Sequence, residues 1–115
     1  MEHIERHDRR DVIKLLKLWK YRRDVPIKIF LLEIMTHLAC YDVKSEFLSD
    51  QLEAVFEYIA TNIVNKPFYD PANRDNIISA DLTRREKFEI RDKAIKALNR
   101  ENWGQIFKNI RYNTS

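Results

Sequence analysis

The chain contains few of the residues that make tight turns and cross-links, with one glycine, three prolines and one cysteine among 115 residues. The lone Cys40 excludes an internal disulfide, and its place in an apolar stretch predicts a buried thiol rather than a reactive one. Scarce glycine and proline, together with 34% charged residues, favour long solvated helices. We therefore predict an all-α fold.

Long apolar runs are also missing. No stretch approaches the roughly 20 apolar residues that a membrane-spanning helix needs, and the first ten residues are too polar for the apolar region of a signal peptide. We expect a cytoplasmic protein without a membrane partner, folded as a single domain over residues 1–115.

Charge is distributed unevenly along the chain. Lys and Arg outnumber Asp and Glu by 8 to 4 over residues 1–23 and by 10 to 6 over residues 71–115, whereas residues 24–70 carry 3 basic and 8 acidic residues. Basic ends suit a polyanionic ligand such as a nucleotide or RNA, although a basic face is often only a solvated face.

Hydrophobic spacing predicts five helices in one compact bundle. The first covers about residues 8–22, with Arg10, Lys14, Lys17 and Tyr21 opposite its apolar stripe. The second helix has Asp24 as its expected N-cap and Pro26 in its first turn, and it runs to about Cys40. It is apolar on nearly every side, so we expect it to be the central helix. Ser49 is the expected N-cap of the third, which reaches Ile63.

Residues 64–82 lose the helical pattern and collect Pro, Asn and Asp, which predicts one long ordered loop. We expect four apolar side chains to pin it to the body: Phe68, Tyr69, Ile77 and Ile78. Thr83 and Glu86 form a capping box that opens the fourth helix. Its expected inner side carries Phe88, Ala94, Ile95 and Leu98, and a fifth helix begins near Glu101.

Three segments in order resemble the C-terminal helical domain of oligoadenylate synthetases and related bacterial signalling nucleotidyltransferases. The first is VIKLLKLWKYRRDVPIKIFLLEIM, similar to a basic helix ending in Lys-x-Trp, a Pro-containing turn and an aromatic followed by Leu-Glu. The second, PFYDPANRDNIIS, is similar to the family's Asp-Pro loop, and the third, WGQIFKNI, to its terminal Trp and Ile-Phe element. The matching residues are Lys17, Trp19, Phe30, Leu32, Glu33, Asp70, Pro71, Asn76, Ile77, Trp103, Ile106 and Phe107.

The resemblance implies a substrate-recognition role. In such enzymes a separate α/β palm domain carries the catalytic carboxylates, and the helical domain forms the other wall of the nucleotide cleft. It implies that Lys17, with Lys14 beside it, contacts the triphosphate, as a compact ammonium charge suits this task. Many relatives place a polar residue that helps hold the triphosphate where this chain has Ile29, so a hydrogen bond is lost there. Two alternatives remain open: Lys28 beside it compensates, or the nucleotide site is degenerate or differently tuned.

The residues for catalysis itself are absent from the chain. Nucleotidyl transfer uses two metal ions held by closely spaced carboxylates, yet no two of the 18 acidic residues are separated by a single residue, and the only glycine is Gly104. We expect no cofactor here, with Mg²⁺ held by a palm domain supplied in cis or in trans.

Other candidate sites have simpler structural interpretations. His3 and His7 have metal-ligand spacing without a third ligand, and His37 is expected in the core or at its boundary. Asp70 and Pro71 are expected to shape a turn, and Glu33 to pair with a basic residue of a neighbouring helix. Aromatic residues of the motifs are expected in the core rather than stacked on a base: Trp19, Phe30, Trp103 and Phe107.

Two hypotheses of function remain. One is a nucleotide-contacting domain of a nucleotidyltransferase, not catalytic alone. The other is a non-enzymatic helical adaptor that binds RNA or a protein through its basic ends. Binding that falls steeply with salt and survives Lys17→Ala favours the second hypothesis, because many phosphate contacts then share the interaction.

Overall fold

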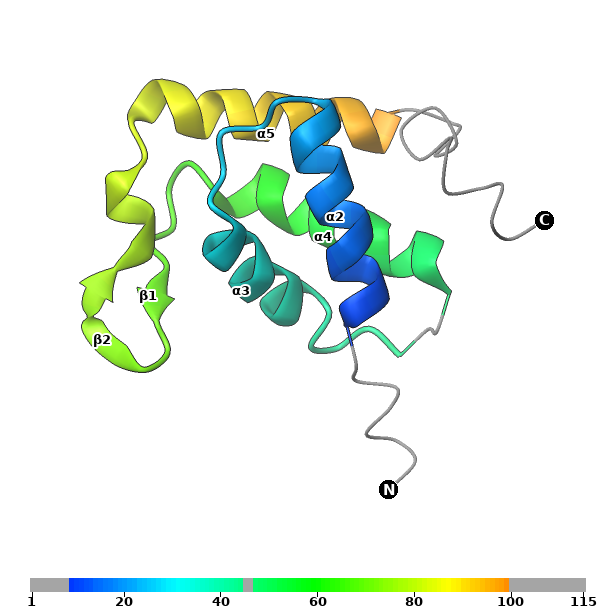
Figure 1. Ribbon diagram of the computed structural model, residues 1–115, viewed down its shortest axis with the longest axis horizontal. Helices are drawn as coiled ribbons and strands as arrows, with labels where there is room; N and C mark the ends of the chain where they lie inside the picture. Colours follow the sequence, from blue (N-terminus) through cyan, green and yellow to red (C-terminus); the bar gives the residue numbers. More distant parts are fainter. Residues whose placement is uncertain (1–8, 45–46, 100–115) are drawn as a thin grey trace.

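A computed structural model of the chain describes residues 9–44 and 47–99 (Figure 1). The α-helices of this part are α2 (Arg10–Arg22), α3 (Ile29–Ala39), α4 (Leu48–Asn62) and α5 (Arg84–Asn99). Between α4 and α5 lie β1 (Tyr69–Asp70), β2 (Asn73–Ile77) and the 3-10 helix η1 (Ile78–Asp81). The helix expected from Glu101, with Trp103 and Phe107, lies outside the described residues.

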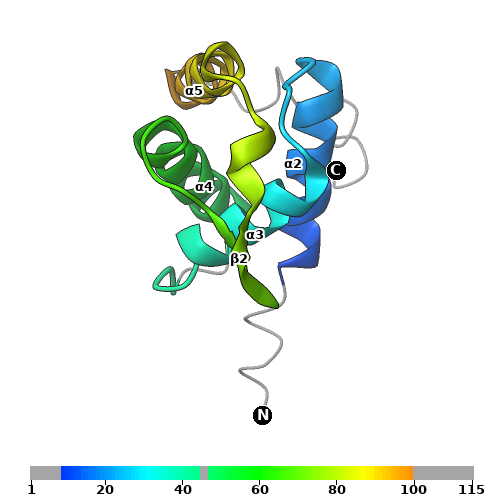
Figure 2. The ribbon, with the colours of Figure 1, turned by 90° about the vertical axis from the view of Figure 1, so that its left-hand side faces the viewer.

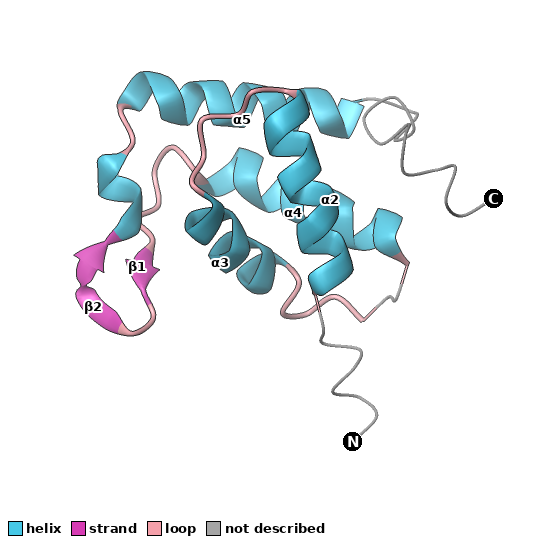
Figure 3. Cartoon of the chain, in the orientation of Figure 1, coloured by secondary structure: helices cyan, strands magenta, loops and turns pink. Residues whose placement is uncertain are grey.

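The helical character of the chain is confirmed, but the all-α prediction is wrong at residues 64–82. An antiparallel pair of strands, β1 and β2, occupies the expected loop and protrudes from the helices (Figure 3). Tyr69 is paired with Ile77 and Asp70 with Asn73, so the register is interrupted between the two pairs. Every residue of β2 is exposed, which explains why no alternation of apolar and polar residues announced the strand.

Two apolar side chains anchor the hairpin to the helices. Phe68 is 2% exposed and Ile78 is 8% exposed, and the Ile78 amide donates a hydrogen bond to the Phe68 carbonyl at 2.7 Å. The Phe68 amide is bonded to the buried Ser79 hydroxyl. Tyr69 and Ile77, expected to help, are 48% and 39% exposed. The protruding ribbon is therefore held only at its base.

Helix α2 follows the sequence prediction closely. Its buried residues are the predicted apolar stripe: Val12, Leu15, Leu16 and Trp19. The Trp19 ring meets Phe56 of α4 edge to face, with ring centroids 4.8 Å apart. This contact fixes Trp19 in the core between α2 and α4.

The central helix is α4, not α3 as the apolar composition of α3 suggested. Helix α4 packs against α2, α3 and α5, and Figure 2 shows α4 and α5 side by side, with α2 on the other side of the molecule. Helix α3 leaves Phe30 and Leu38 49% and 47% exposed. The apolar composition of α3 suggested more burial than the fold gives it, because folded proteins commonly leave some apolar side chains exposed.

The capping box at the start of α5 is confirmed. The Thr83 amide donates to Glu86 Oε1 at 2.9 Å, and the Glu86 amide donates to Thr83 Oγ1 at 3.0 Å. The predicted inner side was partly wrong, since Ile95 is 38% exposed and Ile90 is fully buried. The buried residues of α5 are Ile90, Ala94 and Ala97.

Two helix starts differ from prediction. Asp24 is not an N-cap, because it has a positive φ of 55° in the turn after α2, and Lys28 precedes α3 with an extended backbone. Ser49 lies inside the first turn of α4, which begins after Phe47. Capping preferences therefore located these turns only to within a few residues.

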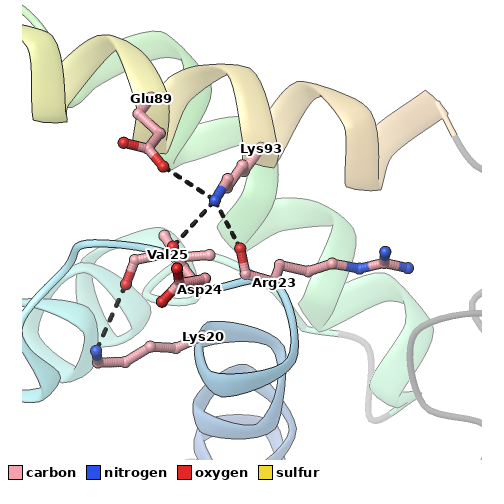
Figure 4. A network of polar contacts seen from close by, with 6 residues as sticks. All are labelled: Lys20, Arg23, Asp24, Val25, Glu89 and Lys93. Carbon is pink, nitrogen blue, oxygen red and sulfur yellow. Dashed lines mark hydrogen bonds and ion pairs between the residues drawn. The ribbon is translucent and has the colours of Figure 1, made fainter.

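Lys93 fastens α5 to the turn between α2 and α3 (Figure 4). Its ammonium donates to the Arg23 carbonyl at 2.6 Å and the Asp24 carbonyl at 3.0 Å, and it lies 3.0 Å from Glu89 Oε2. The side chain of Lys93 is 24% exposed. The Lys93 ammonium thus donates hydrogen bonds to carbonyl groups after the end of α2, which receive no hydrogen bond from within the helix.

Candidate functional site

The outward side of α2 presents the two lysines expected to contact a triphosphate. Lys14 is exposed and Lys17 is partly exposed, and three residues apart they are neighbours on the helix surface. Neither is sealed beneath another helix. Lys14 makes no ion pair with any residue within 9–44 and 47–99.

Lys17 is joined to Glu33 of α3. Its Nζ lies 3.4 Å from Glu33 Oε2, and each side chain is 38% exposed. The predicted structural role of Glu33, an ion pair with a neighbouring helix, is confirmed. Because water screens a pair with this exposure, it contributes at most about 1 kcal/mol, and the ammonium can exchange Glu33 for another anion at small cost.

Phe30 lies one turn before Glu33 on the same side of α3. Its 49% exposure contradicts the expected core position, while the core position of Trp19, 1% exposed, is confirmed. We use "α2–α3 surface" for Lys14, Lys17, Phe30 and Glu33. It combines two ammonium groups, one carboxylate and one half-exposed aromatic ring.

Lys28 is directed to a different neighbour. Its Nζ donates to Asp81 Oδ2 of η1 at 2.7 Å, and the two side chains are 60% and 67% exposed. In the described part of the chain no contact joins Lys28 to Lys14 or Lys17. Ile29, the residue that replaces a polar one, is half-buried at the start of α3.

The Asp-Pro motif shapes the hairpin. Asp70 Oδ1 accepts a hydrogen bond from the Ala72 amide at 2.8 Å, which confirms the expected turn. Pro71 is exposed in this turn and Asn76 is exposed on β2. Among the described residues no hydrogen bond or ion pair joins Asp70 or Asn76 to α2, so the hairpin motif and the two lysines of α2 are separate features.

Histidine and cysteine form no reactive group among the described residues. His37 is exposed, contrary to the expected core or boundary position. Cys40 is fully buried, as expected, and burial raises the pKa of its thiol, with a smaller opposing effect of Arg9. No cluster of three or more His, Cys, Asp or Glu that could hold a metal ion is found within 9–44 and 47–99. His3 and His7 lie outside those ranges.

A second basic surface lies on α5 and was missed at the sequence level. The guanidinium carbons of Arg84 and Arg91 lie 5.3 and 4.8 Å from the centroid of the Phe88 ring. The spacing of four and three residues could have identified this group. The sequence reasoning instead assigned Phe88 to the core.

None of the helices that the structure describes is long and apolar enough to cross a membrane. Comparisons with family models, curated proteins and solved structures gave no match. The interpretation of both basic surfaces therefore depends on the geometry described above.

Proposed function

We propose that this chain is the substrate-recognition helical domain of a nucleotidyltransferase, in which the α2–α3 surface contacts the triphosphate of a nucleotide. The observation that carries this proposal is the accessibility of Lys14 and Lys17 on the outward side of α2. If Lys14 and Lys17 were buried or fully paired, they could not make the phosphate contacts that the resemblance implies.

The charges of the surface favour a weak contact that a partner completes. Two ammonium groups on one helix side can each neutralise a phosphate oxygen, but Glu33 offsets part of this charge through its pair with Lys17. A triphosphate must displace the Glu33 carboxylate to approach Lys17 directly. The isolated chain therefore binds nucleotide with a dissociation constant of about millimolar or weaker, since half of the cleft is missing.

The catalytic carboxylates and their Mg²⁺ belong, in this proposal, to a palm domain provided in cis or in trans. No two acidic residues of the sequence are separated by a single residue, as in an Asp-x-Asp metal site, and this supports the assignment. The chain acts in the cytoplasm, where it binds a nucleoside triphosphate or the acceptor nucleotide and orients it toward the metal ions. Lys28 is a secondary contact, because it first has to leave Asp81.

The direct test is a titration of the ¹⁵N-labelled chain with ATP and with inorganic tripolyphosphate, followed by NMR. Saturating amide shifts are expected along Lys14–Lys17 and Phe30–Glu33, and they should disappear in the Lys14→Gln/Lys17→Gln double variant. Arg85→Gln/Lys96→Gln is the matched control, since it removes the same charge from two exposed positions on α5. Equal loss in the control, or shifts spread over all basic residues, would reject a defined triphosphate site.

A second arm tests the partner. Adding a palm domain of an oligoadenylate-synthetase-like enzyme should strengthen ATP binding by the wild-type chain, and the double variant should reduce that gain. RNA binding that survives Lys17→Ala while ATP produces no shifts would instead favour the adaptor hypothesis.

A further inference from the structure

Two arginine side chains of α5 are held over one aromatic ring. Arg84 lies one turn before Phe88 and Arg91 lies one turn after it, at 5.3 and 4.8 Å from the ring centroid. A guanidinium over an aromatic face is favourable and restricts the motion of the side chain. Two flat cationic groups are therefore ordered before any ligand arrives, which lowers the entropic cost of binding.

Lys87 extends this arrangement, because Arg84, Lys87 and Arg91 follow the i, i+3, i+7 spacing of one helix side. We call these three residues together with Phe88 the α5 basic stripe. Arg91 is 38% exposed in its side chain, and Arg84 is exposed. Lys87 is half-buried, so Arg84 is the most accessible cation of the stripe and the other two are partly accessible.

Positive charge on α5 exceeds the negative charge that could neutralise it. Residues 84–99 contain six Lys or Arg and three Asp or Glu. Each acidic residue already has a partner: Glu86 accepts from the Thr83 amide, Glu89 pairs with Lys93, and Asp92 pairs with Arg91 at 3.1 Å. Arg84 and Lys87 make no ion pair with other residues that the structure describes.

The stripe lies on a different side of α5 from Lys93, which fastens this helix to the turn between α2 and α3. Arg91 and Lys93 are two residues apart, which is roughly 200° around an α-helix, and Lys93 contacts the turn between α2 and α3. The α5 basic stripe is thus on the other side of α5 from that turn. A ligand bound there does not require Lys14 or Lys17.

The neighbouring helix limits the width of the positive surface. Helix α4 packs along α5 and carries Asp50, Glu53 and Glu57 without any Lys or Arg in Leu48–Asn62. A broad polyanion such as a duplex would approach these carboxylates. A narrow single strand can follow α5 alone.

We propose that the α5 basic stripe binds a single-stranded polynucleotide. Arg84 donates paired N–H groups to a phosphate, and Arg91 does the same after it releases Asp92, to which its Nε and Nη2 donate. The outer guanidinium faces stack on unpaired bases, while the Phe88 ring holds the two side chains in place. An acidic peptide would pair with the positive charges but would not stack on the flat guanidinium faces. This binding is separate from the proposed triphosphate contact and holds whether or not that contact exists.

The test measures fluorescence anisotropy of a labelled single-stranded RNA of about 12 nucleotides, with DNA of the same sequence as a second arm to identify the type of strand. The Arg84→Gln/Arg91→Gln variant should bind about tenfold more weakly, and the slope of log affinity against log salt should fall by about 1.4, the loss of two phosphate contacts. Arg85→Gln/Lys96→Gln removes the same charge from α5 outside the stripe and should change affinity by less than about twofold.

A second pair of variants distinguishes stacking on flat side chains from the effect of charge. Arg84→Lys/Arg91→Lys keeps both charges, and Phe88→Leu keeps an apolar side chain without the ring, so each should weaken binding by about twofold to fivefold with little change in salt slope. Circular dichroism and thermal unfolding check that each variant is folded. Lys14→Gln/Lys17→Gln should bind RNA like the wild type.

Three results overturn the assignment. An equal loss of affinity in the control variant and in the stripe variant would mean that net charge alone attracts RNA. Duplex RNA that binds as tightly as the single strand would exclude base stacking. Polyglutamate that displaces RNA at equal charge concentration would identify an acidic protein surface as the ligand.

Discussion

At the scale of single residues, Glu33 is the side chain that most affects the proposed nucleotide contact. It lies 3.4 Å from Lys17, and both side chains are more than a third exposed. An exposed pair of this kind adds little to stability, yet its carboxylate repels an incoming phosphate. Stability and ligand binding should therefore respond differently to its removal.

We predict that Glu33→Gln strengthens binding of tripolyphosphate by about threefold to tenfold, because one like charge is removed from the site. The free energy of unfolding should change by less than about 1 kcal/mol. NMR titration and urea unfolding measure the two quantities. Glu57→Gln on α4 is the control, and an equal gain there would show a general charge effect.

The burial of Cys40 makes the stability of the fold depend on pH. Its thiol is fully buried, and burial raises its pKa above the ordinary value of 9.0. In the unfolded chain the thiol ionises at its ordinary pKa, so the folded state binds the proton more tightly. The stabilisation is complete below the unfolded pKa and is lost as the pH rises toward the folded pKa.

We predict that wild-type stability declines more steeply than that of Cys40→Ala as the pH increases from about 8.5. Below this range the two proteins should differ by a constant amount, which reflects the packing lost with the sulfur. Urea unfolding at a series of pH values provides the difference curve. Parallel curves through alkaline pH would contradict a raised thiol pKa.

At the scale of elements, Lys93 connects α5 to the end of α2. Replacement by Met keeps most of the apolar part of the side chain but leaves the Arg23 and Asp24 carbonyls without this donor. We predict a loss of about 1–3 kcal/mol in the free energy of unfolding, because charge-assisted hydrogen bonds at a partly buried site are removed.

Chemical denaturation checks this value against Lys96→Met, whose exposed position predicts a change within about 0.5 kcal/mol. Similar losses in the two variants would mean that the contacts of Lys93 contribute no more than an ordinary surface lysine. Glu89→Gln should lose only part of the stability that Lys93→Met loses, since it removes one of the three contacts of Lys93.

The elements differ in how well the sequence predicted them. Helices α2 and α4 were clear because their apolar residues fall on a single stripe that the fold buries. Helix α5 was located by its capping box, but its inner side was assigned partly to Phe88, which packs with arginines instead. The hairpin gave no signal, because two short exposed strands need no apolar alternation.

For the proposed site, the positions of the lysines could be predicted from the sequence, but their contacts could not. Periodicity alone placed Lys14 and Lys17 opposite the apolar stripe of α2, which the structure confirms. Their neighbours could not be derived in this way, since the Lys17–Glu33 and Lys28–Asp81 pairs depend on how helices and η1 pack. Phe30 was misassigned for a related reason, because a one-dimensional pattern does not reveal which side of α3 remains uncovered.

At the scale of the whole molecule, the core is concentrated around α4 while the hairpin lies outside it. This separation predicts a large contrast between two changes. Replacing residues 70–76 by Asn-Gly, a turn that can connect Tyr69 directly to Ile77, should alter the free energy of unfolding by less than about 1 kcal/mol.

Phe68→Ala at the base of the same hairpin should instead cost about 3–5 kcal/mol, because it leaves a cavity where the buried ring contacts Tyr58 of α4. Thermal and urea unfolding measure both variants. A shortened hairpin that destabilises the chain as much as Phe68→Ala would show that the exposed ribbon supports the helices.

The edge-to-face contact of Trp19 with Phe56 also gives the molecule an optical reporter. An indole that is 1% exposed emits at shorter wavelength than one in water, and its emission shifts to longer wavelength when α2 separates from α4. In a Trp103→Phe background, Trp19 is the sole indole, so the colour of its fluorescence follows the joining of these two helices during refolding.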